Sequence, residues 1–254
     1  MLVPLFTGAA AGAASARSVR AMLLFSAAVL ALFWLRSPVE SLLGTSPLAA
    51  HTAAERRTTH FAAMLLAVVS AICLVALMWP GDRNALFPLG GIAAAAFVAQ
   101  AALNRFAPRT RMIAQLVGAL GLTCVAPAAY YTATGRLDQR ALVLWAANWL
   151  FACNQIHFVH LRIHAARATT FTEKFSQGKA FFIAQSLTLS VLTALALEQR
   201  IPSWAIGAFL PVLGRGFYWF FRGPSPLQIR RLGWSEMFHG VLFGFLLAAA
   251  FVLS

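Results

Sequence analysis

Charged residues are scarce in this 254-residue sequence, and their scarcity excludes an ordinary soluble domain. They make up 11% of the chain, whereas about 25% is usual in soluble domains. Hydrophobic residues make up 60%, against roughly 45–50% in soluble domains. A soluble domain of this length needs a charged surface around its core, and this sequence has too few charges to build one. The composition therefore predicts a membrane protein.

Cysteines and acidic residues are also few. The three cysteines, Cys73, Cys124 and Cys153, form no C-x-x-C pair, which argues against a thiolate zinc site and a disulfide framework; we expect small buried side chains. The 7 acidic residues against 20 lysines and arginines leave a net charge of +13. In a soluble protein this excess suggests nucleic-acid binding, but here the basic residues lie in short loops between apolar stretches. We therefore expect contacts with membrane lipids, especially anionic head groups, and no nucleic-acid binding.

Complete catalytic and cofactor motifs are absent from the sequence. It contains no G-x-x-x-x-G-K-[ST], no H-E-x-x-H, no G-x-S-x-G and no C-x-x-C-H. These absences argue against a P-loop NTPase, a zincin-type metalloprotease, a hydrolase with a nucleophile elbow and a c-type cytochrome. Whether the protein is an enzyme, which residues would be catalytic and which cofactor it uses all stay open.

What the sequence does contain is a series of apolar segments that recur from end to end. Each is close to the ~20 residues that cross a ~30 Å hydrocarbon layer, and backbone groups in lipid are satisfied by helices. Short connections rich in Pro, Gly, Thr and Arg join the segments, and no linker divides them. We predict one domain over residues 1–254, an all-α transmembrane bundle of about nine helices. The segments are Met1–Ala16, Ala21–Leu35, Phe61–Trp79, Leu86–Leu103, Met112–Tyr131, Ala141–Val159, Ala180–Leu197, Pro202–Phe221 and Met237–Ser254.

The loops between these segments differ in charge, and the difference predicts an orientation. The loops after the second, fourth, sixth and eighth segments hold 13 of the lysines and arginines, and the other four loops hold 6. Loops rich in Lys and Arg stay in the cytoplasm. The bias therefore predicts a cytoplasmic N-terminus, a C-terminus on the far side and an odd number of spans.

Several stretches, in order along the chain, resemble the YwiC-like family of bacterial membrane proteins. They are LVPLFTGAAAG, NRFAPR, APAAYYTATG, WAANWLFACNQIHFVHLRI and RRLGWSEMFHGVLFGFLL. The family carries a Pro-x-Glu-His-Gly-x-Trp stretch just before the LVPL-type segment, and no role of that stretch is carried over because the sequence begins at Met1. The resemblance implies a multi-pass protein of the bacterial cytoplasmic (inner) membrane, and it says little about a reaction.

The architecture is also similar to that of the UbiA superfamily of membrane prenyltransferases. That superfamily holds magnesium and a diphosphate with Asp-rich motifs at the cytoplasmic ends of its second and sixth helices. The corresponding loops here offer Glu40, Glu55 and Glu173, far apart and without aspartate. Magnesium bound to a diphosphate needs several carboxylate oxygens together. We therefore expect a related cavity without magnesium-dependent prenyl transfer.

The sixth segment carries one polar stripe of histidines. At 100° per residue, Cys153, His157, His160 and His164 fall within a ~60° arc of one face. One interpretation makes His157, His160 and His164 ligands of a transition metal or haem, or a proton shuttle. The other places His160 and His164 in a solvated cytoplasmic extension, with His157 hydrogen-bonded in the core. A metal site would need ligands from the second loop, where the candidates are His51, Glu55 and His60.

A second stripe, Asn148, Gln155 and Arg162, lies on nearly the opposite face at a spacing of seven residues. A helix that is polar on two sides in a membrane lies inside the bundle or borders a water-filled cavity. We interpret these three residues as candidate substrate contacts.

The eighth segment contains Arg215 between Gly214 and Gly216. The planar guanidinium fork suits phosphate or carboxylate, and an arginine at this depth needs a partner in the bundle interior. Candidate partners are Glu236 and His239 at the start of the ninth segment. For the remaining arginines of this hairpin, Arg222, Arg230 and Arg231, we favour contacts with lipid head groups.

Two functional hypotheses follow. The first is a protein that handles a lipid or isoprenoid, with an anionic ligand in a cytoplasm-facing cavity contacted by Arg215, Asn148, Gln155, Arg162 and Glu236. The alternative is a small-molecule transporter or a haem-binding accessory subunit of a respiratory chain. A transporter is expected to show inverted repeats and a helix broken near mid-membrane.

Overall fold

The computed structural model describes residues 1–16, 18–42, 44, 52–79, 83–107, 110–168, 170–199, 201–223 and 227–253. These residues form helices joined by turns, without a strand, which confirms the predicted all-α class. Two 3-10 helices, Ala13–Ser15 and Ala165–Arg167, extend α1 and α7. The α-helices are α1 (Leu2–Gly12), α2 (Val19–Leu42), α3 (Ala53–Met78), α4 (Leu86–Phe106), α5 (Arg111–Thr123), α6 (Val125–Thr134), α7 (Gln139–His164), α8 (Phe171–Leu197), α9 (Ser203–Phe221) and α10 (Ile229–Val252).

Helices α5 and α6 follow one another across Cys124, so together they fill one predicted segment. Counted as one, they bring the described part of the chain to the nine helices expected from the sequence. Seven of these helices are long and apolar enough to cross a membrane: α2, α3, α4, the α5–α6 stretch, α7, α8 and α10. The chain is therefore a multi-pass membrane protein.

The α3, α8 and α10 helices begin eight or nine residues before the apolar segments predicted for them. Of these three, α3 and α8 start with a capping box. The Thr52 hydroxyl accepts from the Glu55 N–H while the Glu55 carboxylate accepts from the Thr52 N–H, and Thr170 and Glu173 repeat the arrangement. These caps satisfy N–H groups that a helix start leaves open, so polar turns extend the helices beyond the apolar stretch. Glu55 and Glu173 thus have structural roles at helix starts.

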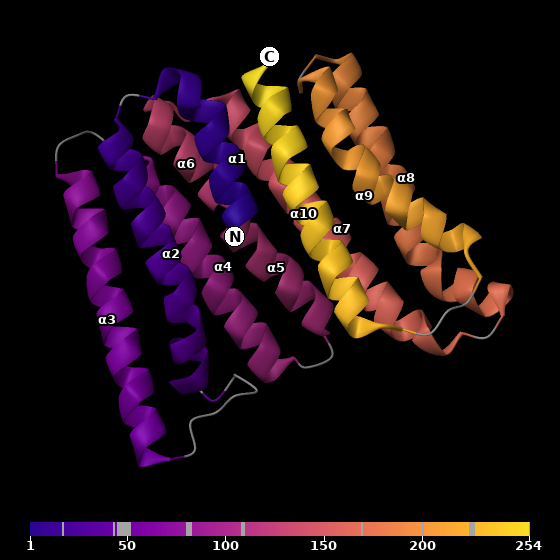
Figure 1. The fold of residues 1–254 in the computed structure, drawn as a ribbon, viewed down its shortest axis with the longest axis horizontal. Coiled ribbons are helices and arrows are strands. Elements are labelled where there is room, and N and C mark those ends of the chain that lie inside the picture. Colours follow the sequence, from indigo (N-terminus) through magenta and orange to yellow (C-terminus); the bar gives the residue numbers. More distant parts are fainter. Residues whose placement is uncertain are drawn as a thin grey trace.

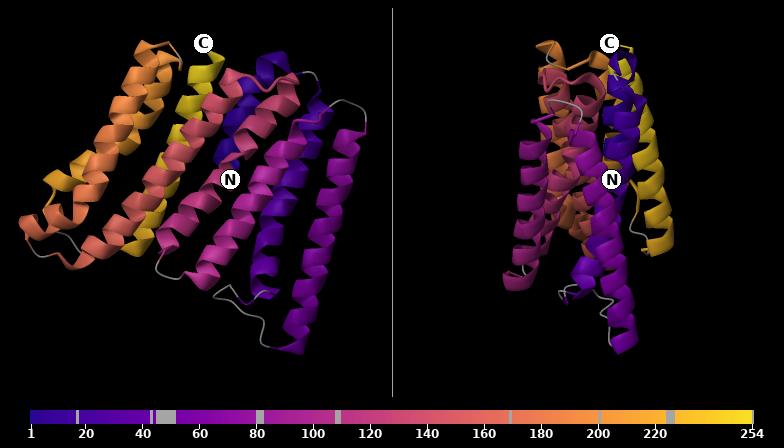
Figure 2. Two further views of the ribbon diagram at one scale, coloured as in Figure 1. Left: turned by 180° about the vertical axis from the view of Figure 1, so that it is seen from behind. Right: turned by 90° about the vertical axis from the view of Figure 1, so that its left-hand side faces the viewer.

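The helices run side by side, from α3 at one edge of the bundle to α8 and α9 at the other (Figure 1). Seen edge-on, the molecule is narrow, with α1, α2 and α10 on one face and α4 and α5 on the other (Figure 2). The helix pairs α2–α3, α4–α5, α7–α8 and α9–α10 all turn at the same end of the bundle (Figure 1). Those turns correspond to the loops that hold 13 of the basic residues, so we name this the basic end.

The short helix α1 begins midway along the bundle and packs against α6 (Figure 1). Gly8 and Gly12 make this packing close: a Cβ added at Gly8 would collide with the Ala126 carbonyl, and one at Gly12 with the Ala133 side chain. Small residues let helix backbones approach in membranes. A second core joins α7, α9 and α10, where the Phe151 and Phe243 rings stack with centroids 3.9 Å apart. These cores fix the positions of α7, α9 and α10, which carry the candidate site.

Candidate anion-binding site

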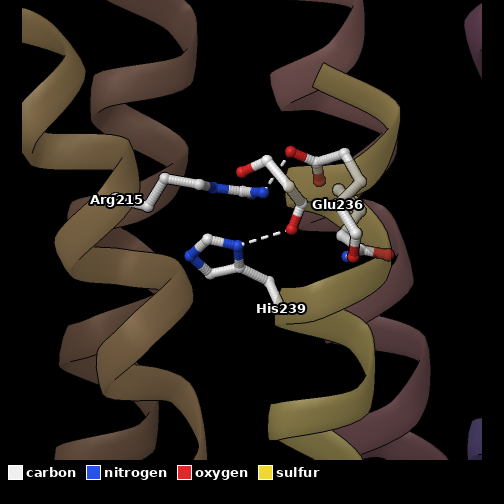
Figure 3. A network of polar contacts seen from close by, with 5 residues as sticks. Arg215, Glu236 and His239 are labelled. Carbon is white, nitrogen blue, oxygen red and sulfur yellow. Dashed lines mark hydrogen bonds and ion pairs between the residues drawn. The ribbon is translucent and has the colours of Figure 1, made fainter. Parts of the chain in front are cut away.

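Arg215 on α9 and Glu236 on α10 form a buried ion pair (Figure 3). Nη1 of the arginine donates to Oε1 of the glutamate, and the two side chains are only 11% and 14% exposed. The structure thus brings together the two residues that the sequence analysis paired. His239, the other candidate partner, instead bonds to the backbone carbonyl of Ser235 through Nδ1, at 2.7 Å.

The neighbouring glycine explains why Arg215 points toward α10. A Cβ added at Gly216 would collide with the Gln185 side chain on α8 and lie tightly against Phe181, so α9 and α8 are in close contact there. Arg215 lies about 100° further round the helix and faces α7 and α10. On the α7 side its guanidinium carbon lies 4.1 Å from the centroid of the Phe158 ring, a cation–π distance.

The ion pair leaves most of the arginine's hydrogen-bonding capacity unused. Nε and Nη2 of Arg215, and Oε2 of Glu236, are buried and have no hydrogen-bond partner among the described residues. A buried donor without a partner costs about 1–3 kcal/mol, and more when it is charged. Two nitrogen atoms of the guanidinium are therefore left without an acceptor.

Such an acceptor has room beside the pair. A pocket of about 320 Å³, here called the arginine pocket, lies between α7, α9 and α10. Four arginines from these helices line it, and none of its lining residues is acidic. The lining consists of Phe158, Arg162, Arg215, Tyr218, Trp219, Arg222, Gly223, Gln228, Arg231, Leu232 and Ser235. Arg222 and Arg231 were expected only to contact lipid head groups, and the structure places both in this pocket.

Lys174 on α8 supports one wall of the arginine pocket, and sequence reasoning missed it. Its side chain is 3% exposed, and Nζ donates to the backbone carbonyls of Trp219 and Arg222. The ammonium also lies 4.3 Å from the centroid of the Trp219 ring. It thus satisfies carbonyls at the C-terminal end of α9, where a cation is favoured. The sequence did contain one indication of a special role for Lys174. It lies in the first turns of α8, where the helix dipole disfavours a cation.

The stripe Asn148, Gln155 and Arg162 is divided between two sites. Arg162 lines the arginine pocket, whereas Asn148 and Gln155 line a separate, more central cavity of about 380 Å³. Gln155 connects the two, because its Nε2 donates to the Glu236 backbone carbonyl at 3.0 Å. The Asn148 Nδ2 donates to the Thr7 hydroxyl at 3.0 Å and to the Leu144 carbonyl at 2.8 Å.

The histidines of α7 line neither the arginine pocket nor the central cavity. His160 Nε2 lies 2.7 Å from Oε1 of Gln115, and His164 Nδ1 lies 2.8 Å from the His160 backbone oxygen. The His157 ring meets the Phe181 ring edge-on, with centroids 5.1 Å apart.

Across the described ranges, no three residues of the His, Cys, Asp and Glu types lie where they could hold one metal ion. Of the ligands proposed from the second loop, His51 lies outside the described residues. Glu55 caps α3, and His60 lies on α3, at the far edge of the bundle from α8 (Figure 1). A metal site formed by His157, His160 and His164 stays a prediction. Metal analysis of purified protein, compared with a His157→Ala/His160→Ala variant, tests it.

Comparisons of the chain with protein-family models, with curated proteins and with solved structures found no match. The resemblances to the YwiC-like family and to the UbiA superfamily therefore stay predictions, and the site is interpreted from its own geometry. That geometry is a cluster of four guanidinium groups near the basic end of a membrane bundle, and the one of Arg215 has two buried nitrogen atoms without an acceptor.

Proposed function

We propose that the protein binds an anionic amphiphile, whose phosphate or carboxylate group lies in the arginine pocket. The observation that carries the proposal is the unsatisfied guanidinium of Arg215, which faces a pocket with three further arginines. Glu236 neutralises one of these four charges, so the site is left with an excess of positive charge. A phosphate or carboxylate would supply acceptors in the planar arrangement that guanidinium groups bind best.

The surroundings of the pocket favour an amphiphile over a soluble anion. Phe158, Trp219 and Leu232 line the pocket beside the arginines. On α9, Tyr218, which also lines the pocket, and Phe221 are exposed large side chains, as expected of residues that face lipid. A ligand with a charged head and an apolar chain would match both environments. This agrees with a protein that handles a lipid or an isoprenoid through a cavity that opens toward the cytoplasm.

A matched pair of variants tests the proposal in lipid nanodiscs. Arg231 lines the pocket and the adjacent Arg230 does not, although both are exposed residues at the start of α10. We expect Arg231→Ala to weaken binding of radiolabelled dodecyl phosphate by about tenfold, the value of one charge-assisted hydrogen bond. Arg230→Ala should bind as the unchanged protein does. Equal loss in both variants would indicate general attraction to the basic end and would overturn the proposal.

Competition with inorganic phosphate distinguishes the two sources of the anionic group. We expect inorganic phosphate to displace dodecyl phosphate only at much higher concentration, because the apolar chain contributes about 0.8 kcal/mol per buried methylene. Displacement at equal concentrations would show that the head group alone is bound, and the ligand would then be a soluble anion.

One observation favours transport as a second candidate function. The span Arg111–Thr134 is interrupted at Cys124, between α5 and α6, and Leu122 and Thr123 beside the break line the central cavity. Broken helices next to a central cavity are typical of secondary transporters. Uptake of a labelled organic phosphate into proteoliposomes tests this function. The haem-binding alternative is tested by the visible absorbance of the purified protein.

A further inference from the structure

Four side-chain amides from three helices converge on the central cavity. Gln100 comes from α4, Gln115 from α5, and Asn148 and Gln155 from α7. Such a cluster inside membrane-spanning helices is costly unless the amides form hydrogen bonds, because lipid offers them none. The amides therefore need hydrogen-bond partners, and the described side chains do not supply all of them.

Two of these amides are buried and held in place, and one of them, Asn148, has an acceptor without a partner. Asn148 is 2% exposed; its Nδ2 is bonded to Thr7 and Leu144, while its Oδ1 has no hydrogen-bond partner. Gln100 is 8% exposed and lies against Gly118 on α5, where an added Cβ would collide with the glutamine amide. Gly118 thus provides the space that the Gln100 side chain occupies.

An apolar space adjoins the amides. Gln100 and Arg36 also line a second cavity of about 340 Å³ between α2, α4 and α5. Most of its walls are apolar, with Val29, Leu32, Phe33, Phe97, Leu122 and Val125 among the lining residues. Gly90 lines it too, and a Cβ added there would meet nothing within 4 Å. The combined space has a polar part at the amides and an apolar part beside α2.

One cationic side chain lines the space at the amides, in contrast to the four that line the arginine pocket. The cationic side chain that lines both spaces is Arg36, and its Nε lies 2.7 Å from Oε1 of Glu40 on the same helix. An anion would gain little from an arginine that is already neutralised. A hydroxyl or carbonyl group suits amides well, because each amide both donates and accepts.

We propose that this space, the amide cavity, is a second binding site that takes an uncharged amphiphile. The hydroxyl or carbonyl head group would bond to Asn148 and Gln100, and the chain would lie against α2 and α4. This site differs from the arginine pocket in both charge and position, so the protein would bind two amphiphiles of different chemistry.

The apolar part of the site is tested by two adjacent glycines. Both Gly90 and Gly91 have open space where a Cβ would be, but only Gly90 lines the cavity. The probe is a long-chain alcohol that carries a diazirine and an alkyne, cross-linked by light to protein in nanodiscs. We expect labelled peptides from α2, α4 and α5, and at least about fivefold less labelling in Gly90→Leu, since a leucine side chain would occupy the space of the probe. Gly91→Leu should label as the unchanged protein does.

The polar part is tested by two glutamines. Gln100→Met removes an amide from the cavity, and Gln185→Met removes a fully buried amide that lines none of these spaces. We expect Gln100→Met to raise the concentration of unlabelled dodecanol needed for competition by about fivefold, the value of one neutral hydrogen bond. Gln185→Met should leave it unchanged.

Three results would overturn the inference: labelling that Gly90→Leu does not reduce, equal loss in Gly91→Leu, or stronger competition by dodecyl phosphate than by dodecanol. The last would mean that the cavity selects an anion. Arg231→Ala supplies the remaining comparison, because it should leave labelling by the alcohol unchanged if the two sites are separate. Melting temperatures of all variants in the same nanodiscs establish that each one is folded.

Discussion

The side-chain amide of Gln155 on α7 donates to the backbone carbonyl of Glu236 on α10, at 3.0 Å. Gln155 lines the amide cavity, and the carboxylate of Glu236 forms the ion pair with Arg215. One hydrogen bond therefore joins the wall of one proposed site to the ion pair of the other. A displacement of α10 at Glu236 would therefore alter both proposed sites.

Replacing Gln155 by leucine should lower the free energy of unfolding by about 1 kcal/mol, the net value of one hydrogen bond. We also expect weaker binding of dodecyl phosphate, because Glu236 and its partner Arg215 lose one support. Thermal unfolding and ligand binding in nanodiscs measure the two effects. Unchanged phosphate binding in a destabilised variant would show that the bond is only structural.

Substitutions of Arg215 should separate charge from geometry. Arg215→Ala leaves Glu236 buried without its partner, and breaking a buried ion pair in this way costs about 3–5 kcal/mol. Arg215→Lys keeps the charge but loses the planar fork. We expect the lysine variant to recover most of the melting temperature but little of the dodecyl phosphate binding. If both variants match the unchanged protein in stability and in binding, Arg215 is not the anchor of the site.

Removing both members of the ion pair should be better tolerated than removing one. A double variant, Arg215→Leu with Glu236→Leu, replaces two buried charges by apolar groups and eliminates the unsatisfied atoms Nε, Nη2 and Oε2. We expect its stability to equal or exceed that of the original chain, as for other buried pairs, while phosphate binding is lost. Such a result would show that the ion pair contributes to phosphate binding and not to stability. A double variant less stable than either single variant would instead give the pair a structural role.

Gln185→Met should stabilise the protein. This glutamine on α8 is fully buried against Gly216, and neither its Nε2 nor its Oε1 has a hydrogen-bond partner among the described residues. A methionine of similar length removes the unsatisfied amide at a gain of about 1–2 kcal/mol. A higher melting temperature with unchanged ligand binding is the expected result. A lower one would mean that the amide has a partner in the membrane, such as an ordered water.

The orientation in the membrane is a prediction from the charge of the loops, and a reporter fusion tests it. Alkaline phosphatase fused after Ser254 should be active, and the same reporter fused at Thr172 should be silent, because the enzyme folds only outside the cytoplasm. The reverse pattern would place the basic end and the arginine pocket on the far side of the membrane.

Hydropathy was sufficient to locate the helices, because each span must be apolar over most of its length. It did not locate the starts of α3, α8 and α10, which begin with polar turns. Those of α3 and α8 are stabilised by the caps at Thr52 and Thr170. Hydropathy reports transfer into lipid, and these turns extend beyond the apolar stretch.

The pairing of Arg215 with Glu236 was predictable for a geometric reason. Arg215 lies six residues before the end of α9, and Glu236 lies seven residues after the start of α10, so an antiparallel hairpin places them at the same depth. The stripe Asn148, Gln155 and Arg162 lies on one face of α7, yet its two ends are 14 positions, or about 21 Å, apart along the helix. That length exceeds one binding site, so the stripe serves two. Lys174 was missed because its partners, the carbonyls at the end of α9, are set only by tertiary packing.

The position of Lys174 has a consequence for how the arginine pocket keeps its shape. A single ammonium holds two carbonyls of α9 and the face of Trp219, yet Lys174 does not itself line the arginine pocket. Replacing Lys174 by methionine would remove the positive charge and all three N–H donors while leaving every arginine in place. The last turn of α9 would then be free to unwind and carry Arg222 away from the ligand. Affinity for the anion would thus depend on a residue that the anion never touches.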